Sequence, residues 1–235
     1  MMAADPIQHE VRLRGLYAIT RDECDTALLI GEVDAALQGG ARIVQYRNKA
    51  ATSSLAKKQA LALREITRSA RALLIINDDI ELALAVGSDG VHLGREDFVD
   101  TGGDIFNAIR QHAKQTQATR IDGAIAGHFL IGISCYNEIG RARAAVTGGA
   151  DYLAFGSVFP SSTKPLANRA GVDLIRQAKK SFSRPVVAIG GITLENAPQL
   201  IEAGVDAVAV ISSLFDGGDN NNIRLRAQRF SSLFP

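Results

Sequence analysis

Residues 73–97 read LLIINDDIELALAVGSDGVHLGRED and contain two short apolar runs separated by a helical segment. The runs, residues 73–76 and 90–93, have the length and composition of buried strands. Residues 80–86 predict one short helix, which Gly87 closes. A crossover of this kind is right-handed and makes its two strands parallel neighbours, so their carboxyl ends lie at the same edge of the sheet.

Carboxylates follow both strands of this unit. Asp78 comes directly after the first strand and Asp97 follows the second, so we expect them to converge. Two converging carboxylates suit a hard, oxygen-preferring cation such as Mg²⁺. The structural alternative is a helix cap, because Asp78 or Asp79 together with Glu81 also fits a capping box.

The remaining chain repeats the same pattern of strand and helix. Six further strands are predicted from runs of strand-forming residues at 15–19, 43–46, 130–134, 152–155, 185–189 and 207–211. The helices between and after the eight strands are predicted at 26–38, 52–71, 80–86, 104–115, 137–147, 172–182, 193–203 and 223–234, with Thr52 or Ser53 and Thr193 as caps. Eight such pairs indicate an α/β fold, a single closed (β/α)₈ TIM barrel, with an open doubly wound sheet as the competitor.

Four helix-to-strand turns also look alike, which hints at a repeated unit. They are Gly39-Gly40-Ala41, Gly87-Ser88-Asp89, Gly149-Ala150-Asp151 and Gly204-Val205-Asp206. Residues 1–14 are mixed and polar, and we expect an N-terminal extension there, followed by the barrel domain at 15–235. Residues 116–128 are predicted to be a loose connection.

Composition restricts the kinds of partner. The formal net charge is +1, so no overall field attracts nucleic acid or a membrane surface. No apolar run approaches the roughly 20 residues of a membrane helix, and the N-terminus lacks the pattern of a secretory signal. Cys24 and Cys135 lie far apart and are interpreted as free thiols of a reducing compartment. We expect a cytoplasmic protein that acts on small molecules.

Candidate functional side chains are sought at the strand ends, where such barrels carry their sites. Gln45, Arg47 and Lys49 alternate after the second strand, and an Arg and a Lys on one side suit a polyphosphate; a solvated basic edge is the alternative. Asn77 can donate a hydrogen bond to an anionic oxygen. Ser134 ends the fifth strand, where it also fits a plain helix start.

Later loops add hydroxyl groups and flexible backbone. The loop after the sixth strand gathers Ser161, Ser162, Thr163 and Lys164, which suit a phosphate or an exposed polar turn. Gly190-Gly191 and Ser212-Ser213 follow the seventh and eighth strands, where many barrels bind phosphate. His92 is predicted to be a hydrogen-bonded core residue, and Cys135 has no candidate base that would make it a nucleophile.

Taken together, these residues resemble the thiamine-phosphate synthase family. The matching segments run in order over residues 15–214: LYAIT (16–20), QYRNK (45–49), IND (76–78), VHLGRED (91–97), GIS (132–134), FGSVFPSSTK (155–164), AIGGI (188–192) and AVIS (209–212). The resemblance implies a (β/α)₈ barrel that requires Mg²⁺. It also implies a transferase that joins 4-amino-2-methyl-5-hydroxymethylpyrimidine diphosphate to hydroxyethylthiazole phosphate, carboxylated or not. The products are thiamine phosphate and pyrophosphate.

The resemblance also implies roles for the matching residues. The pyrimidine diphosphate is expected on Gln45, Arg47, Lys49, Asn77, Ser134 and Lys164, of which Arg47, Lys49, Ser134 and Lys164 are the expected catalytic residues. Asp78 and Asp97 match the Mg²⁺ ligands. The thiazole phosphate is expected on Ser161, Ser162, Thr163, Gly191, Ile211 and Ser212. Ser157, Ser161 and Arg95 depart from the commonest pattern, and Arg95 adds a charge near the metal site.

The expected chemistry needs no general base, because the attacking thiazole nitrogen has a free lone pair. Pyrophosphate leaves, so the protein neutralises an anion and aligns two rings. One alternative is the related thiazole tautomerase, which has a catalytic His where this chain has Ser157. Another is a non-catalytic barrel that senses thiamine precursors. The sequence leaves open whether the protein is a homo-oligomer.

Overall fold

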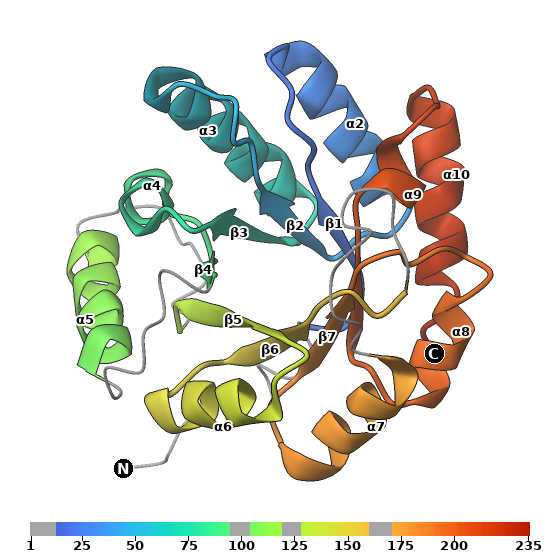
Figure 1. The fold of residues 1–235 in the computed structure, drawn as a ribbon. Helices are drawn as coiled ribbons and strands as arrows, with labels where there is room; N and C mark the ends of the chain where they lie inside the picture. Colours follow the sequence, from blue (N-terminus) through green and yellow to red (C-terminus); the bar gives the residue numbers. More distant parts are fainter. Residues whose placement is uncertain (1–12, 95–103, 119–127, 160–170) are drawn as a thin grey trace.

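The computed structural model describes residues 13–94, 104–118, 128–159 and 171–235 (Figure 1). Within these residues, eight parallel strands close into a barrel in chain order, with the last strand pairing with the first. The strands are β1 (Gly15–Ile19), β2 (Ile43–Tyr46), β3 (Leu73–Asn77), β4 (Gly90–Leu93), β5 (Leu130–Tyr136), β6 (Tyr152–Phe155), β7 (Val186–Ile189) and β8 (Ala207–Val210). The predicted closed barrel is confirmed, and the open sheet is excluded.

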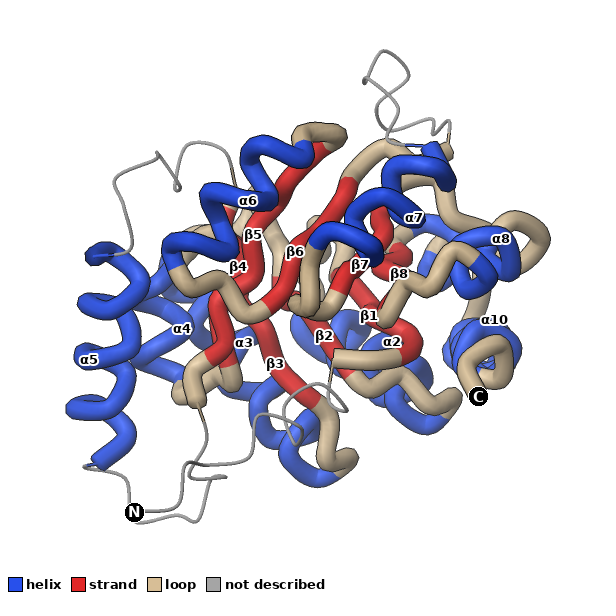
Figure 2. Tube along the Cα trace, turned by 90° about the horizontal axis from the view of Figure 1, so that it is seen from below, coloured by secondary structure: helices blue, strands red, loops and turns tan. Residues whose placement is uncertain are grey.

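Helices surround the barrel, as Figures 1 and 2 show from two directions. They are α2 (Thr26–Gln38), α3 (Ser53–Ser69), α4 (Ile80–Val86), α5 (Asp104–Ala118), α6 (Ile139–Gly148), α7 (Gly171–Ser181), α8 (Ala197–Glu202), α9 (Ser212–Phe215) and α10 (Asn220–Ser231). The final helix, α10, packs against α2, so the end of the described chain returns to its beginning. None of the helices in the described ranges is long and apolar enough to cross a membrane.

The predicted strand–helix–strand unit at residues 73–93 is confirmed. β3 and β4 are parallel neighbours, with Asn77 opposite His92. Asp79 caps α4 by accepting a hydrogen bond from the Leu82 amide at 2.8 Å. Gly87 ends the helix with φ 63°, a left-handed conformation that glycine adopts without steric cost. The carboxyl ends of β3 and β4 therefore lie side by side.

Alternation along each strand divides the core in two. On β3, Leu74 and Ile76 pack outward against the helices, whereas Leu73 and Ile75 pack inside the barrel. Fully burying one such side chain stabilises the fold by about 1.5–3 kcal/mol. The interior cluster is the smaller of the two and includes Ile19 at the end of β1, with Ile189 and Ile211 packed against it.

The largest differences from the predicted helix starts are those of α8 and α10. Thr193 does not cap α8; the cap is Asn196, and the helix begins four residues later than predicted. The reason is local, because the Asn196 Oδ1 accepts a hydrogen bond from the Thr193 amide at 2.8 Å and closes a turn there. The last helix begins at Asn220 rather than at residue 223, because Asp219 caps it.

Three of the four similar turns share one arrangement of hydrogen bonds. In each, the Asp that opens an even-numbered strand accepts a hydrogen bond from the backbone amide of the preceding strand and pairs with a cation from a helix. The carboxylate–amide and carboxylate–cation pairs are Asp89 with Leu74 and Arg64, Asp151 with Ile131 and Arg110, and Asp206 with Val186 and Lys179, at 2.6–2.8 Å. We call these the three Asp latches. The turn before β2 has no such carboxylate, since Arg42 stands there.

The structure describes only part of the predicted division into an N-terminal extension and a barrel domain. Residues 1–12 lie outside the described residues, so the N-terminal extension stays a prediction. Residues 119–127, in the predicted loose connection, also lie outside them.

Candidate active site

A cavity of about 200 Å³ lies at the carboxyl ends of β2 and β3. Its polar lining includes Arg47 and Lys49 from the loop after β2, and Asn77 and Asp78 from the end of β3. Two cations, the carboxylates of Asp78 and Asp79 and the amides of Asn48 and Asn77 therefore line one space. This is the combination that a metal-bound polyphosphate requires.

The loop after β2 is fixed through its backbone. The Thr20 hydroxyl donates to the Arg47 carbonyl and accepts from the Arg47 amide, both at 2.9 Å. The Asp22 carboxylate accepts from the Lys49 amide at 2.8 Å. Arg47 and Asp22 also pair side chain to side chain at 3.6 Å, but both are partly exposed, so this ion pair contributes little. The backbone that carries the Arg47 and Lys49 side chains is thus held in place by hydrogen bonds in the free protein.

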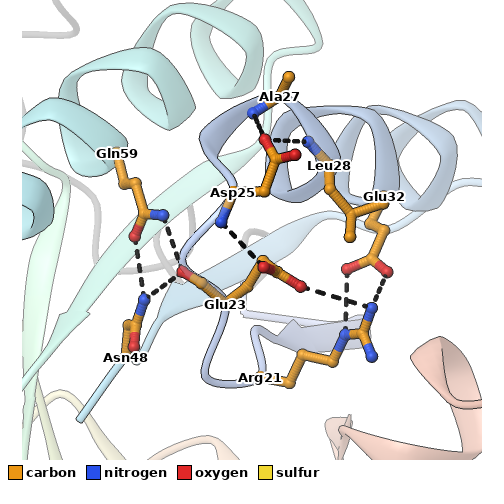
Figure 3. Close-up of polar contacts among 8 residues, drawn as sticks. All are labelled: Arg21, Glu23, Asp25, Ala27, Leu28, Glu32, Asn48 and Gln59. Atoms are coloured by element: carbon orange, nitrogen blue, oxygen red, sulfur yellow. Dashed lines mark hydrogen bonds and ion pairs between the residues drawn. The ribbon is translucent and has the colours of Figure 1, made fainter. Parts of the chain in front are cut away.

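Asn48, between the two cations in the sequence, forms hydrogen bonds to the loop after β1 and to α3 (Figure 3). Its Nδ2 donates to the Glu23 carbonyl at 2.6 Å and to the Gln59 Oε1 at 3.0 Å. Gln59 of α3 is fully buried, and its Nε2 donates to the same Glu23 carbonyl at 2.8 Å. The loops after β1 and β2 are therefore tied to each other and to α3. The spacing of Arg47 and Lys49 indicated their common side, but nothing in the sequence pattern indicated Gln59.

Figure 3 also shows how the loop after β1 is held to α2. Arg21 donates to both carboxylate oxygens of the buried Glu32. The Glu23 carboxylate accepts from the Asp25 amide at 2.8 Å, and Asp25 caps α2. This loop carries Asp22, whose carboxylate accepts from the Lys49 amide, so its fixed course contributes to the placement of Lys49.

Asp78 and Asp79 have different tasks. Asp79 is the helix cap, which resolves the alternative that the sequence left open. Asp78 has φ 61°, a left-handed conformation that few residues other than glycine adopt, although Asp and Asn are among them. Its amide donates to the His92 carbonyl at 2.8 Å, and its Oδ2 accepts from the Asn77 Nδ2 at 2.6 Å. The backbone and a neighbouring amide thus hold this carboxylate beside the cavity.

These donors fit a magnesium ion. Mg²⁺ usually takes one or two protein carboxylates and fills its other positions with water and phosphate oxygens. In the described part of the chain, no cluster of three or more His, Cys, Asp or Glu side chains forms a complete metal cage. Asp97 lies outside the described residues, so its meeting with Asp78 stays a prediction. The condition for that meeting, the parallel pairing of β3 with β4, is confirmed.

Gln45 and Ser134 lie at the two ends of a hydrogen-bond chain that crosses the barrel interior. We call it the interior chain; in order, its members are Gln45 (β2), Tyr17 (β1), Tyr152 (β6), His92 (β4) and Ser134 (β5). The successive donor–acceptor distances are 2.9, 3.0, 3.0 and 2.9 Å. The ligand-binding roles that the sequence predicted for both ends stay predictions, and their connection was not predicted.

The interior chain is almost dry. His92 is 8% exposed, and burial lowers its pKa to about 4, so the imidazole is neutral at physiological pH. The predicted hydrogen-bonded core histidine is thereby confirmed. Burial raises the pKa of both tyrosines, Tyr17 and Tyr152, so each hydroxyl keeps its proton. Ser134 is half-buried and lies within β5 rather than at a helix start.

Cys135 does not belong to this polar group. It packs in the apolar layer between barrel and helices, and burial raises the pKa of its thiol to about 12. A thiol that stays protonated is a poor nucleophile. The nucleophilic role that the sequence disfavoured has no support in the structure.

The ends of β7 and β8 offer backbone groups. Gly190 and Gly191 have φ 105° and 63°, and a Cβ on Gly190 would lie 2.7 Å from the Ser157 amide nitrogen. Ser212 begins the short helix α9, in which the Leu214 and Phe215 amides donate to the Ile211 carbonyl at 3.1 and 3.0 Å. The Ser213 hydroxyl donates to the Ile192 carbonyl at 2.7 Å. Ser161, Ser162, Thr163 and Lys164 lie outside the described residues, so their predicted roles stay predictions.

Comparisons with known proteins agree with this geometry. Residues 16–214 match the family model described as thiamine monophosphate synthase. The chain is 47% identical to a thiamine-phosphate synthase of Methylobacillus flagellatus over 222 residues, covering 94% of this chain and 96% of that one. It is 46% identical to one of Azoarcus over 223 residues, covering 95% and 98%. Among solved structures, a thiamine phosphate pyrophosphorylase from Pyrococcus furiosus superposes with a TM-score of 0.73 at 34% identity, covering 95% and 96%.

Proposed function

This chain belongs to the thiamine monophosphate synthase family, and we propose that its two substrates meet at the carboxyl end of the barrel. The enzyme is a transferase that moves a pyrimidinylmethyl group. It couples 4-amino-2-methyl-5-hydroxymethylpyrimidine diphosphate with hydroxyethylthiazole phosphate and releases thiamine phosphate and pyrophosphate. The open questions are which residues hold each substrate and how they lower the barrier.

The diphosphate is assigned to the cavity at the ends of β2 and β3. The observation that carries this assignment is the shared lining, in which Arg47 and Lys49 face Asn77 and Asp78. The Arg47 guanidinium can bind two phosphate oxygens at once, and the Lys49 ammonium acts as a point charge. Gln45 and Ser134 extend this site into the barrel mouth, and Lys164 is proposed to reach it from the loop after β6.

Asp78 and Asp97 are proposed to hold Mg²⁺ against the diphosphate. The fixed Asp78 carboxylate and the oxygen-only donor set favour this ion over softer metals. When bound, the ion supplies positive charge that offsets the charge of the leaving pyrophosphate.

The chain's own residues then perform two tasks. Arg47, Lys49 and Lys164 stabilise the negative charge that develops as the carbon–oxygen bond to pyrophosphate breaks. The walls of the site hold the thiazole nitrogen in line with the pyrimidine methylene carbon. No residue needs to remove a proton from the nucleophile, because the thiazole nitrogen attacks with its lone pair. This agrees with a neutral His92 and a protonated Cys135 near the site.

The thiazole phosphate is assigned to the ends of β7 and β8. Gly191, Ile211 and Ser212 would bind it through backbone groups, and the left-handed Gly191 at the end of β7 lets the backbone approach a ligand closely. Ser161, Ser162 and Thr163 would add hydroxyl groups from the loop after β6. We place the reaction in the cytoplasm, where thiols such as Cys24 and Cys135 stay reduced.

The metal assignment is tested with two neighbouring variants. Asp78→Asn keeps the size of the side chain and its tolerance of a positive φ but loses a charge. We expect pyrophosphate release at limiting Mg²⁺ to fall by about 100-fold, with partial recovery as Mg²⁺ is raised. Asp79→Asn is the matched control, because Asn caps a helix about as well as Asp.

The outcome separates three explanations of the site. Equal activity of Asp78→Asn and the unchanged chain at limiting Mg²⁺ would remove Asp78 from the metal site. Equal losses in both variants would mean that a charge near α4, not a ligand, is what matters. Release of pyrophosphate only when both substrates are present distinguishes the transferase from an isomerase or a non-catalytic sensor.

A further inference from the structure

The structure assigns a direction to the interior chain: from Gln45 inward, each group donates to the next, so the Ser134 hydroxyl keeps its hydrogen for an anionic ligand. Tyr17, Tyr152 and His92 are then positioning residues, since they act on the substrate only through Ser134. The inference rests on the proposed function where it takes that ligand to be a diphosphate oxygen. The direction itself follows from the free protein.

The first step concerns Gln45. Its Nε2 can only donate, and it donates to the Tyr17 hydroxyl oxygen at 2.9 Å. Among the described residues, that hydroxyl has one further hydrogen-bonding neighbour, the Tyr152 hydroxyl at 3.0 Å. If Tyr152 donated to Tyr17, the Tyr17 hydrogen would be buried without an acceptor, which is costly. Tyr17 therefore donates to Tyr152.

The second step concerns His92. Because the Tyr152 hydroxyl oxygen accepts from Tyr17, its own hydrogen goes to its other hydrogen-bonding neighbour, the His92 Nδ1 at 3.0 Å. That nitrogen must carry a lone pair, so the hydrogen of the neutral imidazole lies on Nε2. The Nε2–H then donates to the Ser134 Oγ at 2.9 Å. In this arrangement each group from Gln45 to His92 donates one hydrogen to the next, and neither tyrosine hydroxyl nor the imidazole has a second hydrogen to place.

The third step concerns the hydroxyl at the end. Because the Ser134 Oγ accepts from His92, its own hydrogen must point elsewhere. Ser134 is half-buried, and in the described part of the chain no protein acceptor receives this hydrogen. A hydroxyl whose oxygen already accepts a hydrogen bond is a better donor. The opposite direction would turn oxygen lone pairs toward the anion and repel it.

The packing around Tyr152 supports a built arrangement. The Tyr152 ring contacts the Tyr17 ring edge-on, with centroids 6.3 Å apart, and stacks on the His92 ring at 5.6 Å. On β5, Gly132 leaves the room that the Tyr152 ring fills, because a Cβ there would overlap the ring. The position of the hydroxyl that links Tyr17 to His92 is thus fixed by three strands.

The first test determines the position of the proton on His92 without any substrate. Nitrogen-15 spectra of the full chain, labelled at histidine, separate a ring nitrogen that carries hydrogen from one that does not. We expect hydrogen on Nε2 and a lone pair on Nδ1. Hydrogen on Nδ1, or on both nitrogens, would overturn the inference. The signals are assigned by their loss in His92→Gln or, if that variant does not fold, by replacing the other three histidines one at a time.

A pair of tyrosine variants sharpens this measurement. Tyr152→Phe removes the link to His92, and we expect the fraction of the Nε2–H form to fall. Tyr46→Phe is the matched control, since it also deletes a buried hydroxyl bonded to a Gln side chain, that of Gln59 at 2.8 Å. We expect the His92 spectrum to be unchanged in the control. An equal change in both variants would contradict the assigned direction.

The second test asks whether the effect reaches the ligand through Ser134. In the unchanged chain, Tyr152→Phe is expected to lower kcat/KM for pyrophosphate release by about tenfold. In a Ser134→Ala chain the same change should cost less than about twofold, because the group it positions is gone. Equal losses in both backgrounds would overturn the positioning role. If neither chain releases pyrophosphate, the proposed function fails, while the spectra still decide the direction.

Discussion

At the scale of single residues, the site depends on adjacent residues whose side chains have different bonding partners. Arg47, Asn48 and Lys49 all line the cavity, but the Asn48 amide is bonded to Gln59 of α3. Asp78 faces the cavity, while Asp79 caps the following helix. In both cases one residue uses its side chain to fix the backbone of its neighbour. Function and structure are therefore carried by adjacent residues.

Gly132 illustrates a residue that matters for what it lacks. The Tyr152 ring occupies the space where a Cβ would lie, so Gly132→Ala forces the ring or the strand to move. We expect the variant to lose about 2 kcal/mol or more of unfolding free energy in urea. Activity should fall with it, because the ring carries a hydroxyl of the interior chain.

Gly140 provides the matched control for this change. It lies exposed in α6, and a Cβ added there would meet no atom within 4 Å. Gly140→Ala is expected to raise stability by about 0.5–1 kcal/mol, since Ala is the better helix former. Equal unfolding free energies of Gly132→Ala and Gly140→Ala would show that the barrel interior accommodates the added methyl group without loss of stability.

At the scale of elements, the three Asp latches join each of three even-numbered strands to the strand before it. In each latch the Asp forms two hydrogen bonds with one residue of the preceding strand. Its carboxylate accepts from the amide of that residue, and its own backbone amide donates to the carbonyl of the same residue. The cation then comes from the helix that precedes that residue's strand. One short turn thus fixes a strand, its neighbour and a helix.

Asp151 is the latch that gives a pH-dependent prediction. Burial alone would raise its pKa, but hydrogen bonds and charges from His128 and Arg110 outweigh burial and lower it below its ordinary value of 3.8. A carboxyl whose pKa is lowered on folding stabilises the fold above its unfolded pKa. That contribution is lost as the pH falls through the folded pKa. The stability of the protein should therefore decrease below about pH 4.

Asp151→Asn is expected to remove this contribution. At neutral pH the variant should lose about 2–3 kcal/mol, because the partly buried Arg110 keeps its charge without its partner. Its stability should also depend less on pH in the acid range. Asp173→Asn, which removes an exposed ion pair with Arg176, is the control and should unfold like the unchanged chain. Parallel acid unfolding curves for Asp151→Asn and the unchanged chain would contradict the latch.

The elements themselves were largely predictable. Every strand was predicted to within about two residues, because short apolar runs bounded by Gly and Asp are strong local signals. The start of α8 and the whole of α9 were missed. Both depend on side chains that close turns, such as Asn196 on Thr193 and Ser213 on Ile192, and periodicity does not register such contacts.

At the scale of the whole molecule, the barrel brings together residues that are far apart in the chain. Tyr17 and Tyr152 are 135 positions apart, yet their hydroxyls are 3.0 Å apart. The candidate ligands Arg47, Lys49, Asn77 and Asp78 could be predicted, because each follows or ends a strand and parallel strands share one end. The interior chain could not, because it depends on which side chains meet across the barrel. No spacing along a strand contains that information.

The central claim is that Asp78 holds a magnesium ion against a diphosphate at the carboxyl end of β3. A crystal soaked with Mg²⁺ and pyrophosphate tests it most directly. We predict a metal on the Asp78 carboxylate and pyrophosphate oxygens on Arg47, Lys49 and the Ser134 hydroxyl. Pyrophosphate bound at the opposite end of the barrel, beside the three Asp latches, or a metal that does not touch Asp78, would contradict the claim.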